Sequence, residues 1–253
     1  MSVIGNPILI LKQQTPYLLE PFGSTSDENL VMLIQAAHAG KVDLQTDAGW
    51  QVGDKRTISI SAFTGGGNVS HLAQNIDIAI SSFDDYENCG CVMQFDFADE
   101  LESGNRMNSS ATNAGGYGNS EMYNTTLPAL VNALPTYLRN LLIEFNCKAS
   151  AGGASTAIRT VTGNKLALRS EIEIFGNTSF SVSGEGTQIQ YYKTSYPYSR
   201  TKKRGHSSSA YADWWLRSPM SAYNIPFCMV TASGSSYISS STDALGVAPF
   251  GCI

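Results

Sequence analysis

Residues 213–219, with the sequence DWWLRSP, constrain the fold of this chain more than any other stretch. Two tryptophans, a leucine and an arginine in succession are too apolar for a solvated loop, which favours a strand. Because successive side chains of a strand point to opposite faces, Trp214 and Leu216 should face one side and their neighbours the other. Pro219 lacks the N–H that a central strand requires, so strand pairing should end there.

Asp213, Trp215 and Arg217 would share the second face of this strand. The guanidinium has three candidate partners: the Trp215 ring, the Asp213 carboxylate, or an anion on a ligand. Two interpretations stay open. In the first, which we favour, a buried Arg–Asp pair orients a core hairpin; in the second, Trp215 and Arg217 belong to a ligand-binding site.

The composition limits the classes of function. The chain has 253 residues, 42% of them hydrophobic and only 15% charged, which is enough for one large domain or two small ones. Ser, Thr, Asn, Gly and Tyr take the place of charged residues, which suits hydrogen bonding to polar partners or to neighbouring subunits. The net charge of −5 argues against nucleic-acid binding, because phosphates are neutralised by clustered Lys and Arg. The one basic run, residues 200–204, is interpreted as a solvated loop.

The five cysteines predict neither a disulfide framework nor a metal site. Cys89 and Cys91 are too close in sequence for an easy bridge, and no other zinc ligand lies near them in the sequence. Cys147, Cys228 and Cys252 lie among apolar residues and are expected to be small buried side chains. We therefore expect reduced thiols, as in a protein that folds in the cytoplasm.

The first 23 residues are expected to be a docking arm. No positive charge precedes Lys12, so no signal peptide is evident, and the apolar run 7–11 is too short to span or insert into a membrane. Prolines interrupt the segment, which predicts an extended conformation without a core of its own. A disordered leader is the alternative, but apolar side chains are costly to leave in water. These side chains are Ile8, Leu9, Ile10, Leu11, Tyr17, Leu18, Leu19 and Phe22.

Helices and strands are expected to alternate in the rest of the chain. Residues 25–28 form a capping box that begins with Thr25, which predicts a helix over 26–39. Further helices are expected over 121–132 and 135–142. Strict alternation predicts strands of an antiparallel sheet at 57–61, 76–80 and 91–97. A hairpin should join 227–232 to 236–240, and residues 247–253 should complete the sheet. Residues 102–120 and 147–163 are expected to be loops.

Residues 165–175 are expected to form a strand that carries two acids, Glu171 and Glu173, on one side. Paired carboxylates are typical of glycosidases, but two acids on one strand point the same way and cannot flank a bond. A structural role is favoured, with an acid accepting backbone N–H groups or pairing with an arginine. No Ser-His-Asp arrangement and no zinc-protease spacing accompanies the three histidines.

The most informative surface feature is a mixture of Tyr, Ser, Asn and Gly in residues 191–211 and 221–242. Antibody paratopes use this mixture, because tyrosine provides rigid contact area and the small residues provide adaptable hydrogen bonds. The same residue types bind sugars. We therefore expect Tyr223, Asn224, Tyr237 and Ser239 to contribute to ligand binding, with plain polar loops as the alternative.

Several motifs resemble those of an uncharacterised domain family with a WWLRSP or YWLRSP signature. They are WWLRSP at 214–219, GVAPF at 246–250, GWQVGD at 49–54, GYGNSEM at 116–122 and LRSEIEIFG at 168–176. This resemblance covers roughly residues 40–253. The family is common in low-GC Gram-positive bacteria and their phages, often in virion structural and tail-fibre proteins. The late motifs are also similar to the C-type-lectin fold of sulfatase-modifying enzymes and phage tropism proteins.

The resemblance implies one α+β domain of C-type-lectin-like type over residues 26–253, with antiparallel sheets and two or three short helices, preceded by the arm at 1–25. It implies a non-enzymatic virion protein at a tail tip, fibre or baseplate, made in the host cytoplasm and exposed on the particle. Such a protein would form homo-oligomers, contact other virion proteins through residues 1–23, and bind a host-surface glycan or protein. We expect no catalytic residue, cofactor or metal.

Two alternatives stay open. The first is a purely structural virion subunit, such as a capsid decoration or collar protein. The second is an enzyme of the sulfatase-modifying type, in which a cysteine pair binds copper; Cys228 and Cys252 are the candidates for that pair, although their sequence context differs from that of such enzymes.

Overall fold

The alternating segments of the first half of the chain form one antiparallel sheet. The computed structural model describes residues 17–194, 199–206 and 208–253. Its largest sheet has the strand order β1-β4-β5-β14-β8, and all its neighbouring strands are antiparallel. The strands are β1 (Lys55–Ile60), β4 (Gln74–Ser82), β5 (Gln94–Phe97), β14 (Phe250–Cys252) and β8 (Leu166–Ala167). The predicted antiparallel sheet is therefore confirmed, and strand β14 lies inside it, next to β5.

The WWLRSP stretch belongs to a second antiparallel sheet. Its strands are β11 (Trp214–Pro219), β12 (Pro226–Val230) and β13 (Ser236–Ser240), in that order. The predicted hairpin is confirmed, with Cys228 opposite Ile238. The predicted division of β11 into a core face and a polar face is wrong, because all six of its residues are buried. Other parts of the chain cover both faces of this strand.

A hairpin occupies residues 145–164, where the sequence predicted a loop. Strand β6 (Phe145–Gly152) pairs with β7 (Ser155–Asn164). Cys147, Ala149 and Ala151 are buried on β6, whereas most of β7 is exposed. The strand is built from small residues, which the low-complexity sequence did not reveal as a buried face.

The predicted strand over 165–175 is also wrong. Only Leu166–Ala167 is a strand, and Glu171–Phe175 forms helix α4. The Ser170 hydroxyl accepts the Glu173 N–H, while the Glu173 carboxylate accepts the Ser170 N–H. This capping box fixes the start of a helix, and Gly176 ends it in the left-handed conformation.

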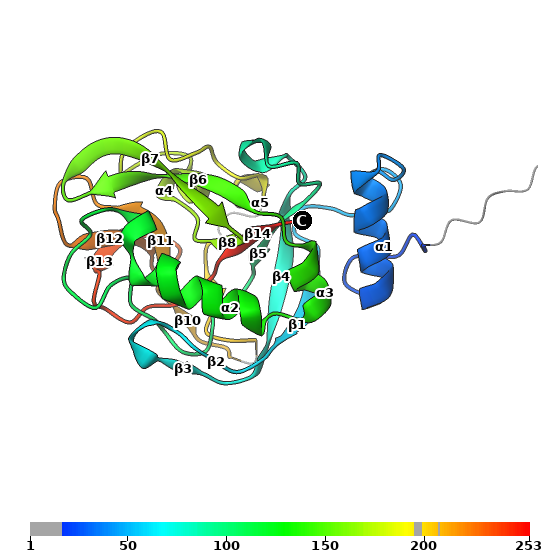
Figure 1. Cartoon of the computed structure of the whole chain (residues 1–253), viewed down its shortest axis with the longest axis horizontal. Helices are drawn as coiled ribbons and strands as arrows, with labels where there is room; N and C mark the ends of the chain where they lie inside the picture. The colour runs from blue at the N-terminus through cyan, green and yellow to red at the C-terminus, as the bar shows by residue number, and fades with distance from the viewer. Residues whose placement is uncertain (1–16, 195–198, 207) are drawn as a thin grey trace, which may run out of the picture.

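The other predicted helices are confirmed with shifted ends. Helix α1 (Asp27–His38) is capped by Ser26 and not by Thr25. A π-helical turn, η4 (Met122–Thr126), leads into α2 (Leu127–Ala133), and α3 (Thr136–Leu141) follows. Helix α1 lies at one end of the molecule, on the side of α3 (Figure 1). The remaining elements are α5 (Gln190–Thr194), β2 (Phe63–Thr64), β3 (Ser70–His71), β9 (Lys202–Lys203), β10 (Tyr211–Ala212), η1 (Gly66–Asn68), η2 (Tyr86–Asn88) and η3 (Tyr117–Asn119).

The expected docking arm is partly anchored in its own domain. Residues 1–16, including the apolar run 8–11, lie outside the described part of the chain. Phe22 is buried against Trp50, with ring centroids 5.2 Å apart. Leu18 and Leu19 remain 65% and 55% exposed. Within the described ranges, no helix has the length and apolarity needed to cross a bilayer.

The basic run 200–204 is not the solvated loop that the sequence predicted. Lys202 is fully buried, its ammonium donates to the Phe97 carbonyl, and its Nζ lies 4.9 Å from the centre of the Trp214 ring. Burial lowers the pKa of Lys202 to about 8. The Trp214 indole N–H donates to the Arg200 carbonyl at 2.9 Å. The run therefore packs against the WWLRSP strand.

Candidate functional site

Arg217 is a structural residue and not a ligand-binding one. Its guanidinium is fully buried and forms a bidentate pair with Glu173, with N–O distances of 2.6 and 2.9 Å. Its remaining N–H groups donate to the carbonyls of Lys148, Leu168 and Glu185 and to the Tyr86 hydroxyl. The expected partner Asp213 instead accepts the Ala232 N–H. No donor is left for a ligand.

Trp215 is likewise unavailable as a binding residue. It is fully buried, and its indole N–H donates to the Asn105 carbonyl at 2.7 Å. The second interpretation of the WWLRSP strand, a ligand site that contains Trp215 and Arg217, is therefore wrong. The first interpretation, a buried Arg–Asp pair, is correct about burial and pairing but not about the partner. Arg217 pairs with Glu173 of α4 and not with Asp213.

The tripeptide Leu-Arg-Ser occurs twice, at 168–170 and 216–218. Arg169 is also fully buried, and its guanidinium pairs with Asp96 at 2.8 Å. Burial opposes the ionisation of Glu173, but the Arg217 guanidinium lowers the pKa of Glu173 below its usual value. Both arginines thus have buried carboxylate partners, and the repeated tripeptide was a sequence signal for this arrangement.

The Glu171 carboxylate accepts hydrogen bonds from neighbouring backbone and side-chain groups. It accepts the N–H groups of Phe180 and Ser181 and the hydroxyls of Ser181 and Ser236. The structural role that the sequence favoured for the two acids is therefore confirmed, for Glu171 through N–H groups and hydroxyls and for Glu173 through an arginine.

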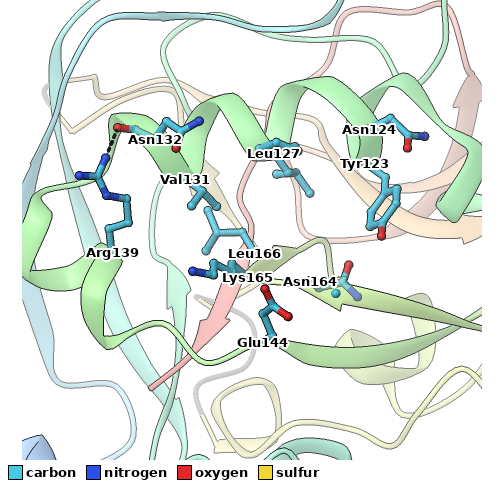
Figure 2. Close-up of a pocket in the computed structure, with 12 residues that line it drawn as sticks. Tyr123, Asn124, Leu127, Val131, Asn132, Arg139, Glu144, Asn164, Lys165 and Leu166 are labelled. Carbon is cyan, nitrogen blue, oxygen red and sulfur yellow. Dashed lines mark hydrogen bonds between the residues drawn. The ribbon is translucent and has the colours of Figure 1, made fainter.

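A cleft lined by charged, amide and apolar side chains lies between α2 and the β6–β7 hairpin (Figure 2). Its volume is about 440 Å³. Tyr123, Leu127 and Val131 form one wall, from η4 and α2, and Leu166 lies opposite (Figure 2). The cleft therefore has apolar side chains on two facing sides, and its rims carry amide and charged side chains.

Tyr123 is fixed at one end of this cleft. Its backbone N–H donates to the Ser120 hydroxyl at 3.1 Å, and its own hydroxyl donates to the Thr162 carbonyl at 2.6 Å. Its ring lies edge-on to that of Tyr117, with centroids 5.4 Å apart. Partial burial raises the pKa of Tyr123, so the hydroxyl stays protonated and keeps its donor role. The ring edge is thus presented to the cleft in one orientation.

Three charged side chains line the other end. Arg139 donates to the Asn132 carbonyl at 3.0 Å, and Glu144 and Lys165 lie on the opposite rim (Figure 2). In the described part of the chain, none of these three charges forms an ion pair with another side chain. They remain available to a polar ligand.

A second hollow continues from the first. Tyr123 lines both, and successive residues of β7 pass from one to the other. The second hollow has a volume of about 540 Å³ and is lined by Asn119, Arg159 and the threonines 160 and 162. We call the two hollows together the Tyr123 groove. Its length along β7 suits an elongated ligand.

Each half of the groove contains a buried polar atom without a partner. Asn164 lines the first half, and its Oδ1 accepts no hydrogen bond among the described residues. Ser150 lines the second half, and its Oγ is likewise unpartnered within the described ranges. Such atoms are uncommon, because a buried polar group without a partner costs about 1–3 kcal/mol. Because both atoms are buried, a ligand hydroxyl would bond to them only after the side chains that cover them have moved aside.

The surface rich in Tyr, Ser, Asn and Gly was predicted for two segments, and the first of them, 191–211, begins with Tyr191 and Tyr192, which are buried. We call the four predicted binding residues of the second segment, Tyr223, Asn224, Tyr237 and Ser239, the tyrosine surface. Tyr223 and Tyr237 are 62% and 56% exposed. Asn224 is exposed, and the hydroxyl of the partly buried Ser239 donates to Asp243. Their ligand-binding role stays a prediction.

Asn113 connects the tyrosine surface to the groove. Its amide N–H₂ group donates to the carbonyls of Tyr223 and Pro226 at 2.9 and 2.8 Å, and its Oδ1 accepts the Gly153 N–H at 2.7 Å. The turn that carries Tyr223 is thereby tied to the β6–β7 hairpin. Sequence reasoning missed Asn113 because asparagine is common in loops.

The cysteines differ from expectation in one respect. All five are free, and Cys147, Cys228 and Cys252 are buried as predicted. However, Cys252 lies beside Cys89 and Cys91, so the statement that these two lack a further ligand is wrong. Of the two cysteines considered for copper, Cys228 has its sulfur 3.9 Å from the Glu171 carboxylate, and Cys252 lies with Cys89 and Cys91.

Residues 91–253 match the family described as "Domain of unknown function (DUF6273)". The chain belongs to this family, and the matched residues include the groove, the tyrosine surface and the WWLRSP strand. No curated protein matches the chain, and no solved structure matches it.

Proposed function

We propose that this protein is a non-enzymatic component of a bacteriophage particle, at a tail tip, fibre or baseplate, and that it binds a host-surface glycan in the Tyr123 groove. The observation that carries the glycan proposal is the pair of unpartnered buried atoms, Asn164 Oδ1 and Ser150 Oγ, one in each half. A sugar hydroxyl both donates and accepts, so it can satisfy either atom.

Three further features support a glycan. The groove combines a fixed aromatic ring, amide groups and threonines, which match the apolar faces and hydroxyls of sugars. Its two joined halves suit a polymer better than a single sugar. Arg139 and Lys165 would attract acidic groups on the polymer, because neither has an ion-pair partner among the described residues.

The particle context rests on the resemblance of the WWLRSP and upstream motifs to virion proteins. A C-type-lectin-like arrangement is part of the same proposal, and the mixed α+β fold with antiparallel sheets supports it. Exposed Leu18 and Leu19 support docking of the N-terminal segment onto a neighbouring subunit. Antibodies against the protein should label intact particles; labelling of infected cells alone, with purified particles unlabelled, would contradict the particle assignment.

The proposal is tested by comparing how tightly the parent and the groove variants bind purified cell-wall polysaccharide from low-GC Gram-positive bacteria. Ser150→Ala should weaken binding about 3–10-fold, the equivalent of one hydrogen bond. Its unfolding free energy should stay unchanged or rise, because the hydroxyl has no partner among the described residues. Tyr123→Ala should weaken binding about tenfold or more. Isothermal titration calorimetry measures the affinities, and urea unfolding measures the stabilities.

The double variant Tyr223→Ala with Tyr237→Ala is the matched control on the tyrosine surface, since it removes two exposed rings outside the groove. If it abolishes binding while Tyr123→Ala and Ser150→Ala do not, the ligand site is the tyrosine surface. If every variant binds polysaccharide as the parent does, or the parent binds none, the glycan proposal is wrong and a purely structural subunit is favoured.

A further inference from the structure

Three cysteine sulfurs lie close together, although one of the cysteines is far from the other two in the sequence. The Sγ atoms of Cys89, Cys91 and Cys252 all lie within 4.8 Å of one another. Cys91 and Cys252 are buried, and Cys89 is partly exposed. Cys252 is the last residue of β14, and the backbone pairing of Ile253 with Met93, at 2.9 Å, sets its position beside the Cys89–Cys91 loop.

The loop that carries Cys89 and Cys91 is held in shape by its own contacts. The Asp85 carboxylate accepts the N–H groups of Gly90 and Cys91 at 2.8 and 3.1 Å. Gly90 has a φ of 83°, which a glycine adopts without strain. The Tyr86 N–H donates to the Cys91 sulfur at 3.4 Å.

We propose that Cys89, Cys91 and Cys252 form a site for a thiophilic cation, with Zn²⁺ as the reference ion. Zinc–sulfur bonds of about 2.3 Å in a tetrahedral site place sulfurs about 3.8 Å apart. The three sulfurs are thus within about 1 Å of the separation that a tetrahedral zinc site requires. Binding would convert three thiols to thiolates and release their protons to solvent.

The burial pattern defines the kind of site. Two sulfurs lie in the interior, and the third reaches the surface, so the fourth position of a tetrahedral ion would face solvent. The ion would join β14 to the loop at residues 85–91. Cys147 and Cys228 take no part in this cluster. The site does not line the Tyr123 groove and does not depend on the proposed glycan binding.

Zinc titration of the reduced full-length protein, without oxygen, tests the proposal. The parent should bind one ion per chain, and Co²⁺ in its place should give sulfur-to-metal charge-transfer absorption. Because even an outer-shell change costs about 10–100-fold in metal affinity, Cys89→Ala should weaken Zn²⁺ binding about a hundredfold or more. The matched control Cys147→Ala, a buried cysteine outside the cluster, should bind as the parent does.

Folding of each variant is checked by circular dichroism, and Cys89 is the preferred position because it is the most exposed of the three. Zinc should raise the unfolding temperature of the parent and of Cys147→Ala, and leave that of Cys89→Ala unchanged. The proposal is overturned if the parent binds less than one ion per chain, if Cys89→Ala retains the affinity of the parent, or if cobalt shows no sulfur ligation.

Discussion

Arg217→Met should lower the free energy of unfolding by about 3–5 kcal/mol, because it leaves the Glu173 carboxylate buried without its cation. Two additional effects act in the same direction: the carbonyls of Lys148, Leu168 and Glu185 each lose a donor. Methionine preserves much of the volume of arginine, so the loss reports the charge and the hydrogen bonds more than a cavity. Urea unfolding monitored by tryptophan fluorescence measures the change.

Two controls identify the cause. Adding Glu173→Leu to Arg217→Met should recover part of the loss, since the unpaired charge is then removed. Arg159→Met, on the exposed face of β7, should change the unfolding free energy by no more than about 0.5 kcal/mol. Equal losses for Arg217→Met and Arg159→Met would show that the buried pair is not what supports this region.

Glu185→Gln should become more stable than the parent as the pH rises. Burial raises the pKa of Glu185 from 4.5 to about 7, although the hydrogen bond from Ser218 and the charge of Arg217 act in the opposite direction. A carboxyl whose pKa is raised on folding stabilises the protein below its unfolded pKa, and this contribution is lost as the pH rises through the folded pKa. The parent should therefore lose this contribution between about pH 4.5 and pH 7.

Glutamine resembles the protonated acid and does not ionise. The variant should therefore keep the contribution to the free energy of unfolding that the parent loses when Glu185 ionises. The stability difference between the two proteins should increase by about 3 kcal/mol from about pH 4 to about pH 8. Burial raises the pKa of Glu100 to about 7 as well, but Glu100 is present in both proteins and its contribution cancels. Urea unfolding at a series of pH values provides the measurement, and a difference that does not vary with pH would rule out a raised pKa at Glu185.

Elements with a strict pattern were predicted well from the sequence. The alternation of residues 57–61 and 76–80 matches β1 and β4, and the Ser-Gly-Ser turn correctly placed the β12–β13 hairpin. These signals are local: the side-chain period and the turn residues suffice. Helix α1 was likewise predicted with an error of one residue at its cap.

The wrong predictions of secondary structure and burial arise where the local sequence pattern is weak or is overridden by other contacts. The hairpin at 145–164 buries alanine and cysteine, whose small side chains leave no strong alternating pattern. Over 165–175, apolar residues suggested a strand, but the capping box at 170–173 starts a helix instead. The basic run at 200–204 is recruited to the core by Trp214, a contact between distant residues that no local pattern encodes.

The candidate sites show the same limit. Exposure of Tyr223 and Tyr237 was correctly expected from their polar neighbours. The Tyr123 groove joins residues 115–166 from several elements, and the cysteine trio joins residues 89 and 252. Neither can be inferred without the tertiary fold. The repeated Leu-Arg-Ser tripeptide contains both buried arginines, but the sequence predictions made no use of it.

The position of β14 in the main sheet has a consequence for the order of events during synthesis. Residues 250–252 lie between β5 and β8 and hydrogen-bond to both. While the ribosome is still making the preceding segments, β5 and β8 lack the neighbour that joins them, and their backbone edges stay open. This half of the sheet therefore assembles only after residue 252 has been made, which exposes the nascent chain to edge-to-edge aggregation and makes chaperone binding at that stage advantageous.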